Sequence, residues 1–347
     1  MKSGIFQGIA GNRFFSRYKS LILFLAIAAL MPLITRTEYT IHTLCMMMLY
    51  AFLASSWNIL GGLCGHFSLG NGVYMGLGAY ITAAMFSYGG VTPWIAIPIA
   101  ALAAALISLV LSYPCFKLRG SYYCLCTIAL LSLFRLVICN EQRIFGLDLG
   151  ASVGLRISWR GGIGNMQFDS KVSYYYIIMV LLAAAVFISI YLQHSKTGYY
   201  FSAITTNQVA AEALGVNTTR YKLKAQFISA FLTALGGGFY LMLIMYIDPN
   251  RILGATFSIE IMLYAVIGGI GSVWGPVLGA LALYPISEGL RGVLGTNASG
   301  LPTAIYGLVM MLVIYFMPSG IFPWLVEKVG TVYRKRTGGT AKSKEVG

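Results

Sequence analysis

Few side chains in this 347-residue chain could do chemistry, and three of them fall in or beside hydrophobic runs: Arg135, Glu260 and Glu288. An ionisable group at membrane depth is costly and usually functional, so these residues could couple transport to an ion gradient. Structural roles are the alternative. Arg135 could extend its guanidinium towards a membrane surface. Glu260 could lie among headgroups or meet a cation, and Glu288 could be neutralised by Arg291 three residues later.

No enzyme motif accompanies these residues. The chain has no GxxxxGK[ST] phosphate loop, no HExxH and no GxSxG. Its cysteines and histidines lack the spacing of a zinc site. We therefore expect no catalytic residue, no metal site and no cofactor on this chain. If transport is uphill, its energy must come from elsewhere.

Two blocks, residues 61–80 and 258–280, are unusually rich in glycine. Glycine costs about 1 kcal/mol per helix position relative to alanine, so its abundance needs a reason. One reason is close helix packing at GxxxG spacings, as at Gly72 and Gly76 and at Gly271, Gly275 and Gly279. The other is a broken helix that lines a transport pathway. The candidate pathway residues are Gly65, Ser68, Asn71, Gly268, Gly269, Gly271 and Ser272, of which the serines and the asparagine suit a small zwitterion.

A polar stretch, residues 205–224, separates two hydrophobic runs. Asn207 is a good helix N-cap, about two turns of helix formers follow, and Gly215 is a typical helix stop. Thr218 or Thr219 could cap the next helix. An ordinary solvated loop would not need both ends of a short helix to be capped. A rigid knob that enters a groove on a partner would need them.

The composition predicts which kind of secondary structure carries these residues. The chain is 58% hydrophobic and 10% charged, with a mean hydropathy of +0.77, whereas a soluble domain carries about 25% charge. We predict an all-α, polytopic integral membrane protein with about ten transmembrane helices, broken or short at the two glycine-rich blocks. The expected helices are 20–35, 41–60, 72–88, 93–114, 120–139, 173–193, 222–246, 257–270, 274–292 and 301–318.

The net charge of +14 comes from short basic clusters between hydrophobic runs. This distribution indicates membrane topology rather than nucleic-acid binding. With both termini in the cytoplasm, most of the lysines and arginines lie inside. The chain then divides into a cytoplasmic tail (1–19), a transmembrane permease domain (20–325) and a basic cytoplasmic tail (326–347). The domain has a cytoplasmic loop at 194–222 and an extracytoplasmic loop at 140–172.

The polar stretch also carries a family resemblance. Residues 210–222, AAEALGVNTTRYK, are similar to the cytoplasmic loop of LivH/LivM-type permeases, the membrane subunits of branched-chain amino acid ABC importers. Both glycine-rich blocks and residues 117–123, KLRGSYY, resemble that family in the expected order. The resemblance covers roughly residues 40–320 and is closer to the LivM half than to the LivH half.

The resemblance implies a permease subunit, not an enzyme, in a bacterial cytoplasmic (inner) membrane. Its expected partners are ABC ATPase subunits, which would bind ATP and Mg²⁺, a second LivH-like permease and an extracytoplasmic substrate-binding protein. The loop that couples to the ATPase would use Asn207, Ala211, Glu212, Gly215 and Arg220. Glu212 would make a polar contact in the ATPase groove, and Gly215 would supply the turn.

Several alternatives to import of branched-chain amino acids remain open. The substrate could be urea, a short amide or another amino acid. The chain could instead be a gradient-driven secondary transporter that uses Glu260 or Glu288, or a structural subunit of a larger complex.

Overall fold

The computed structural model describes residues 20–32, 37–118, 120–141, 143–144, 147–148, 150–294, 301–317, 320–325 and 327–328. The predicted tails, 1–19 and 326–347, lie outside the described residues except for 327–328.

Helices dominate the described residues. An apolar helix at Ser20–Pro32 comes first. The elements that follow are α2 (Glu38–Asn58), the π-helix η1 (Ile59–Leu63), α3 (Asn71–Ser87), α4 (Pro93–Cys115), α5 (Ser121–Asn140), α6 (Lys171–His194), α7 (Lys196–Thr206), α8 (Gln208–Ala213), α9 (Thr218–Ile244), α10 (Pro249–Ile252), α11 (Ala255–Gly269), α12 (Gly275–Leu294) and α13 (Leu301–Phe316).

A helix occupies each of the ten ranges expected from hydropathy. Among the described residues, five helical segments are long and apolar enough to cross a membrane: Glu38–Leu63, Pro93–Cys115, Ser121–Asn140, Lys171–His194 and Thr218–Ile244. Ser20–Pro32, Ala255–Gly269 and Ala304–Phe316 are apolar but shorter. The all-α polytopic class is therefore confirmed, and the count of ten crossings stays a prediction.

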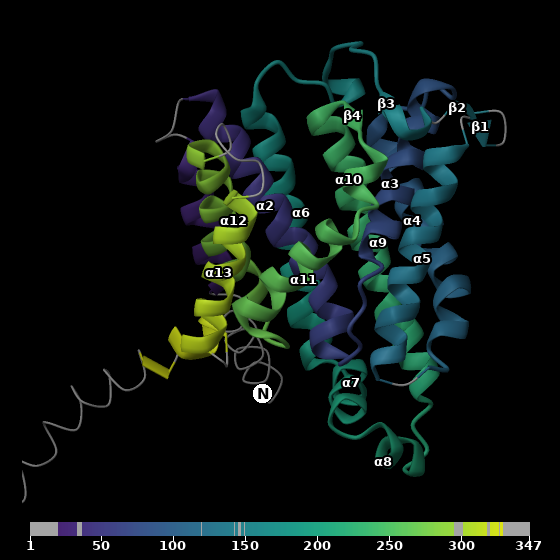
Figure 1. Cartoon of the computed structure of the whole chain (residues 1–347), viewed down its shortest axis with the longest axis vertical. Helices are drawn as coiled ribbons and strands as arrows, with labels where there is room; N and C mark the ends of the chain where they lie inside the picture. Colours follow the sequence, from purple (N-terminus) through teal and green to yellow (C-terminus); the bar gives the residue numbers. More distant parts are fainter. Residues whose placement is uncertain are drawn as a thin grey trace, which may run out of the picture.

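The long helices run side by side along the long axis of the molecule (Figure 1). The α7–α8 segment projects from one end of this bundle, and the strands of the 140–172 connection lie at the other end. The two connections that we assigned to opposite membrane faces therefore lie at opposite ends of the molecule.

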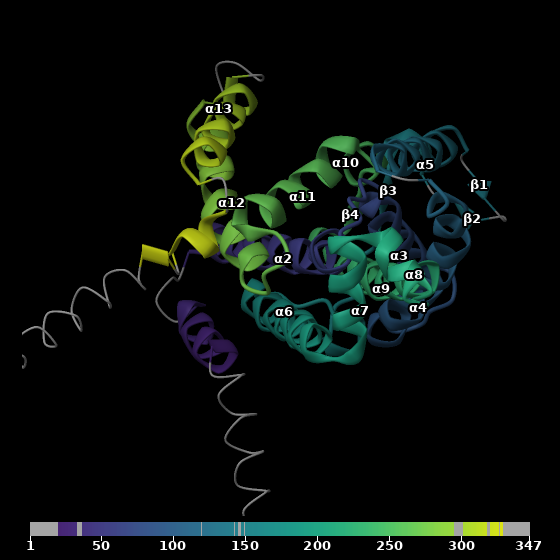
Figure 2. The ribbon, with the colours of Figure 1, turned by 90° about the horizontal axis from the view of Figure 1, so that it is seen from below.

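Two helices form the centre of the bundle. The apolar part of α2 and η1 is completely buried, and most of α9 is buried as well. Helices α3 and α4 pack on α9, while α6, α11 and α12 pack on α2. Figure 2 shows α13 at one edge, beyond α12, on which it packs.

The connection at 140–172 is not a plain loop. It contains two-residue strands, β1 (Arg143–Ile144), β2 (Leu147–Asp148) and β3 (Leu155–Arg156), of which β3 pairs antiparallel with β4 (Tyr246–Ile247) after α9. The indole nitrogen of Trp94 donates to the carbonyl of Ile163 (2.8 Å). The connection is thereby fastened to the ends of α4 and α9.

Candidate functional site

The projecting segment holds a short helix, α8, with both ends closed. The side-chain oxygen of Asn207 accepts from the backbone N–H of Ala210 (3.1 Å), which confirms Asn207 as the N-cap. Gly215 has a φ of +82°, a left-handed conformation that favours glycine, and it ends the helix as expected. The N–H of Val216 then donates to the carbonyl of Ala211 (3.0 Å) and closes the turn.

The cap of the next helix is Asn217, so the expectation of Thr218 or Thr219 was wrong. The side-chain oxygen of Asn217 accepts from the backbone N–H of Arg220 (3.0 Å). The Thr218 hydroxyl instead donates to the Glu212 carboxylate (2.6 Å). The 194–222 region also contains α7, which the sequence analysis did not predict.

A chain of polar side chains fastens α8 to α9. Lys222, only 2% exposed, donates from Nζ to the Gln208 side-chain oxygen (2.8 Å). The Gln208 amide donates to Glu212 Oε1 (2.8 Å), the same oxygen that accepts from Thr218. The Glu212 carboxylate thus accepts hydrogen bonds from two side chains of the same polar stretch. A charge buried with hydrogen-bonding partners holds its neighbours in one arrangement, because leaving it unpaired is costly.

The exposed surface of α8 carries apolar side chains beside the carboxylate of Glu212. Val209 is 61% exposed and Leu214 is 85% exposed, whereas Ala211 is 3% exposed and faces inward. Arg220 lies beyond α8, exposed in the first turn of α9. Of the five predicted coupling residues, Asn207, Glu212 and Gly215 therefore shape α8.

The early glycine-rich block breaks the path between α2 and α3. Helix α2 passes into the π-helix η1, and residues 64–70 are non-helical before α3 begins at Asn71. The Trp57 indole donates to the carbonyl of Ser68 (2.6 Å), and the Thr127 hydroxyl accepts from the N–H of Leu69 (3.0 Å). The irregular backbone of these residues is stable because its polar groups find hydrogen-bond partners inside the protein. We call residues 64–70 the early break.

His66 lies within the early break and is structural. Its ring packs edge-on against Phe116 and Tyr123, with centroids 5.9 and 5.8 Å away. The pKa of His66 is lowered to about 4. Burial is the main cause and the ammonium of Lys222 adds to it, while the hydrogen bond with the backbone carbonyl of Cys64 opposes them. The imidazole is therefore uncharged at neutral pH, and Lys222 lies near the early break as well as α8.

The late glycine-rich block contains a second break, residues 270–274, between α11 and α12. The Ser272 hydroxyl donates to the carbonyl of Gly269 (2.7 Å) and accepts from the N–H of Gly275 (3.0 Å). Gly275 and Gly279 pack so tightly on Gly268 that a side chain on any of them would overlap backbone. Gly271 does not share in this packing. It lies in the turn with a φ of +73°.

Asn58, at the end of α2, binds the late break. Its side-chain amide donates to the carbonyl of Ser272 (2.9 Å), and its oxygen accepts from the N–H of Gly271 (3.0 Å). A Cβ on Gly271 would come within 3.4 Å of the Gly62 carbonyl oxygen. The predicted pathway residue Gly271 is therefore held against Gly62 of the early glycine-rich block, through a residue that the sequence analysis missed, whereas the predicted Gly65 lies against Thr205.

The projecting segment reaches this junction through α7. Thr205 Oγ1 donates to the carbonyl of Leu63 (3.1 Å), and a Cβ on Gly65 would touch it (2.9 Å). A cavity of about 200 Å³ lies between Gly62, Gly271 and the end of α7. Movement of α7 would therefore act directly on the start of the early break, and the late break borders the same cavity.

Among the three polar pathway candidates, Asn71 differs from the serines. The Ser68 hydroxyl accepts from the N–H of Gly70 (3.3 Å), and that of Ser272 is used in its own turn. Asn71 is 1% exposed, and its Nδ2 has no hydrogen-bond partner among the described residues. A buried donor without a partner needs an explanation, and a transported ligand is one.

The ionisable residues have separate surroundings. Glu260 Oε1 accepts from Arg291 Nη2 (3.1 Å), so the cation that Glu260 meets is Arg291. The spacing argument had paired Arg291 with Glu288, and the salt bridge corrects that assignment, because helix packing brings α11 alongside α12. Arg135 is exposed on α5. Within the described residues, no group of three or more His, Cys, Asp or Glu side chains is placed to hold a metal.

Asn58, Thr205, Gln208 and Lys222 are site residues that sequence reasoning missed. Lys222 offered a signal, because it is a lysine that enters a predicted span. For Asn58 and Thr205 the sequence offered none, since their partners are backbone groups far away along the chain.

The comparisons with known proteins find transport permeases. The family model described as "Branched-chain amino acid transport system / permease component" matches residues 39–318. The high-affinity branched-chain amino acid transport system permease protein LivM of Salmonella typhimurium is 27% identical over 87% of this chain and 74% of its own length. LivH of the same organism is 25% identical over 78% of this chain and 90% of its own. The fructose import permease protein FrcC of Rhizobium meliloti is 32% identical, over 44% of this chain and 40% of its own. No solved structure matches.

Proposed function

The chain belongs to the family of branched-chain amino acid transport permeases, as a LivM-type member, and from that premise we propose that it imports branched-chain amino acids as one half of an ATP-driven permease pair. A LivH-like subunit forms the other half, two ABC ATPases bind at the α8 end, and an extracytoplasmic binding protein delivers the substrate. The membrane is a bacterial cytoplasmic membrane, with both termini inside.

The observation that carries this proposal is the junction between α8, α7 and the two breaks. In the proposed complex, α8 enters a groove on the ATPase with the exposed apolar residues Val209 and Leu214, the second of which directly follows the helix. Closure of the ATPases moves α8; the Lys222 chain passes that motion to α9, and the Thr205 contact passes it to the early break. The breaks then switch between two arrangements, which gives alternating access.

Gly215→Val is expected to uncouple ATP hydrolysis from uptake. A β-branched residue in a left-handed conformation costs about 1–2 kcal/mol, so the α8–α9 turn would change shape. No atom lies within 4 Å of a Cβ at Gly215, so crowding would not unfold the chain. Parallel uptake and ATPase assays on the complex measure the effect. Gly215→Asn is the control, because asparagine tolerates this conformation, and wild-type uptake by the valine variant would refute the role of the turn.

Asn71→Leu tests the proposed substrate contact. Losing one hydrogen bond from a buried donor is expected to raise the KM for leucine about tenfold, with coupling intact. Removing a buried amide group without a partner should not harm folding, so the amount of assembled complex should be normal. Asn140→Leu, at an exposed site on α5, is the control. An unchanged KM in Asn71→Leu would remove Asn71 from the pathway.

Gentle purification of the tagged chain from its native membrane tests the assembly. A phosphate-loop ATPase and a second permease should copurify, and a recovered binding protein should bind leucine in preference to urea or fructose. An intact complex that contains this chain alone would contradict the proposal.

A further inference from the structure

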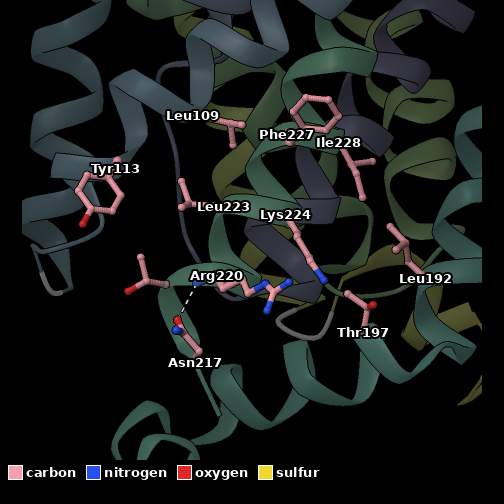
Figure 3. Close-up of a pocket in the computed structure, with 11 residues that line it drawn as sticks. Leu109, Tyr113, Leu192, Thr197, Asn217, Arg220, Leu223, Lys224, Phe227 and Ile228 are labelled. Atoms are coloured by element: carbon pink, nitrogen blue, oxygen red, sulfur yellow. Dashed lines mark hydrogen bonds between the residues drawn. The ribbon is translucent and has the colours of Figure 1, made fainter.

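A large groove lies beside α9, at the end of the bundle from which α8 projects. Its volume is about 810 Å³, and its walls come from α4, the end of α6, the start of α7 and the first three turns of α9 (Figure 3). Helix α4 packs closely on α9, whereas α6 barely touches it, which leaves the space open. Figure 3 shows Leu109 and Phe227 at one end of the groove, with Arg220 and Asn217 at the other.

The lining separates charge from apolar surface. The basic residues Arg220 and Lys224 are four apart on α9, so they lie on the same face of the helix. Leu109, Leu223 and Phe227 are among the apolar lining residues, and no acidic residue lines the groove. Among the described residues, neither Arg220 nor Lys224 forms a salt bridge. The groove is therefore complementary to a molecule with an anionic head and an apolar tail.

The length of the groove also matches the thickness of the hydrocarbon region of one membrane leaflet. From Asn217 to Ile228, α9 advances about 16 Å at 1.5 Å per residue. Half of a hydrocarbon core about 30 Å thick is a similar distance. We propose that this groove holds an anionic phospholipid of the cytoplasmic leaflet, with its phosphate at Arg220 and Lys224 and an acyl chain along Leu109 and Phe227. The proposal rests on the orientation given under Proposed function.

Such a lipid would act on coupling. Arg220 lies in the first turn of α9, and its backbone N–H is bound by the cap Asn217, two residues after Gly215. A phosphate held by Arg220 and Lys224 would fix the start of α9 against α4 and α6. With the start of α9 fixed in this way, α8 would transmit the movement of the ATPases to the rest of the bundle.

Native mass spectrometry of the full chain, with the subunits it retains, tests the binding. The probes are phosphatidylglycerol and phosphatidylcholine with the same acyl chains. We expect phosphatidylglycerol to be retained in preference. Arg220→Gln and Lys224→Gln should each reduce that preference roughly fivefold, and salt should weaken it. Leu223→Trp, which fills the apolar part of the groove and keeps both charges, should reduce retention of phosphatidylglycerol as well.

Lys328→Gln is the matched control, since it removes an exposed lysine outside the groove and should leave the preference unchanged. Equal retention of both lipids, or a preference that survives both glutamine substitutions, would overturn the proposal. So would a Leu223→Cys variant that cross-links to the second permease and not to a photoreactive phosphatidylglycerol. None of these readouts depends on transport, so the lipid site can fail while the permease function stands.

Discussion

Lys222→Met is expected to lower ATP-driven uptake at least tenfold while the complex still assembles and hydrolyses ATP. The substitution removes the buried ammonium that donates to Gln208, and with it a side-chain link from α9 to α8; the link from Thr218 to Glu212 remains. A hydrogen bond from a charged group is worth about 1.5–3 kcal/mol, and tenfold corresponds to about 1.4 kcal/mol. With the Lys222 link lost, α8 can move when the ATPases close, but less of the motion is passed on to α9.

Lys196→Met is the control for this prediction. Lys196 is an exposed lysine in the same 194–222 region and makes no such contact, so uptake should stay near wild type. Uptake and ATP hydrolysis are measured on the same proteoliposomes. Normal uptake by Lys222→Met, or equal loss in both variants, would show that the buried chain does not transmit the motion.

Gly271→Trp is expected to abolish uptake altogether. Gly271 has a φ of +73°, donates to Asn58, and lies against the Gly62 carbonyl. An indole there would strain the backbone and force the two breaks apart. Gly271→Ala is expected to give partial loss, because it adds the backbone strain without the bulk.

Gly289→Trp separates this effect from a general effect of tryptophan. Gly289 lies in α12, and among the described residues no atom lies within 4 Å of a Cβ built there. Its variant should insert and transport normally. Wild-type uptake by Gly271→Trp, with both proteins present in the membrane at equal amounts, would show that the junction of the breaks is not on the transport route.

Hydropathy was enough to predict helices in the ten hydrophobic runs, but not α7, because each hydrophobic run of a membrane protein must satisfy its own backbone hydrogen bonds. Local capping chemistry was enough for Asn207 and Gly215, since their partners lie within four residues. The break at Gly271 was foreseen from glycine content, but its partner was not.

The rest depends on contacts between distant parts of the chain. Asn58 and Gly271 are 213 residues apart, and Glu260 and Arg291 are 31 apart. Spacing along one helix favoured Arg291 with Glu288, and only the packing of α11 against α12 shows the actual partner. For Glu212, the sequence could not show that its carboxylate accepts hydrogen bonds from Gln208 and Thr218, and its contact with an ATPase stays a prediction.

The most direct test of the account is leucine uptake by proteoliposomes with ATP on the α8 side. The account predicts uptake only when this chain is reconstituted with its second permease, its ATPases and the binding protein, and none by the chain alone under any ion gradient. Gradient-driven uptake by the chain alone would contradict the central claim and direct attention to Glu260 and Glu288.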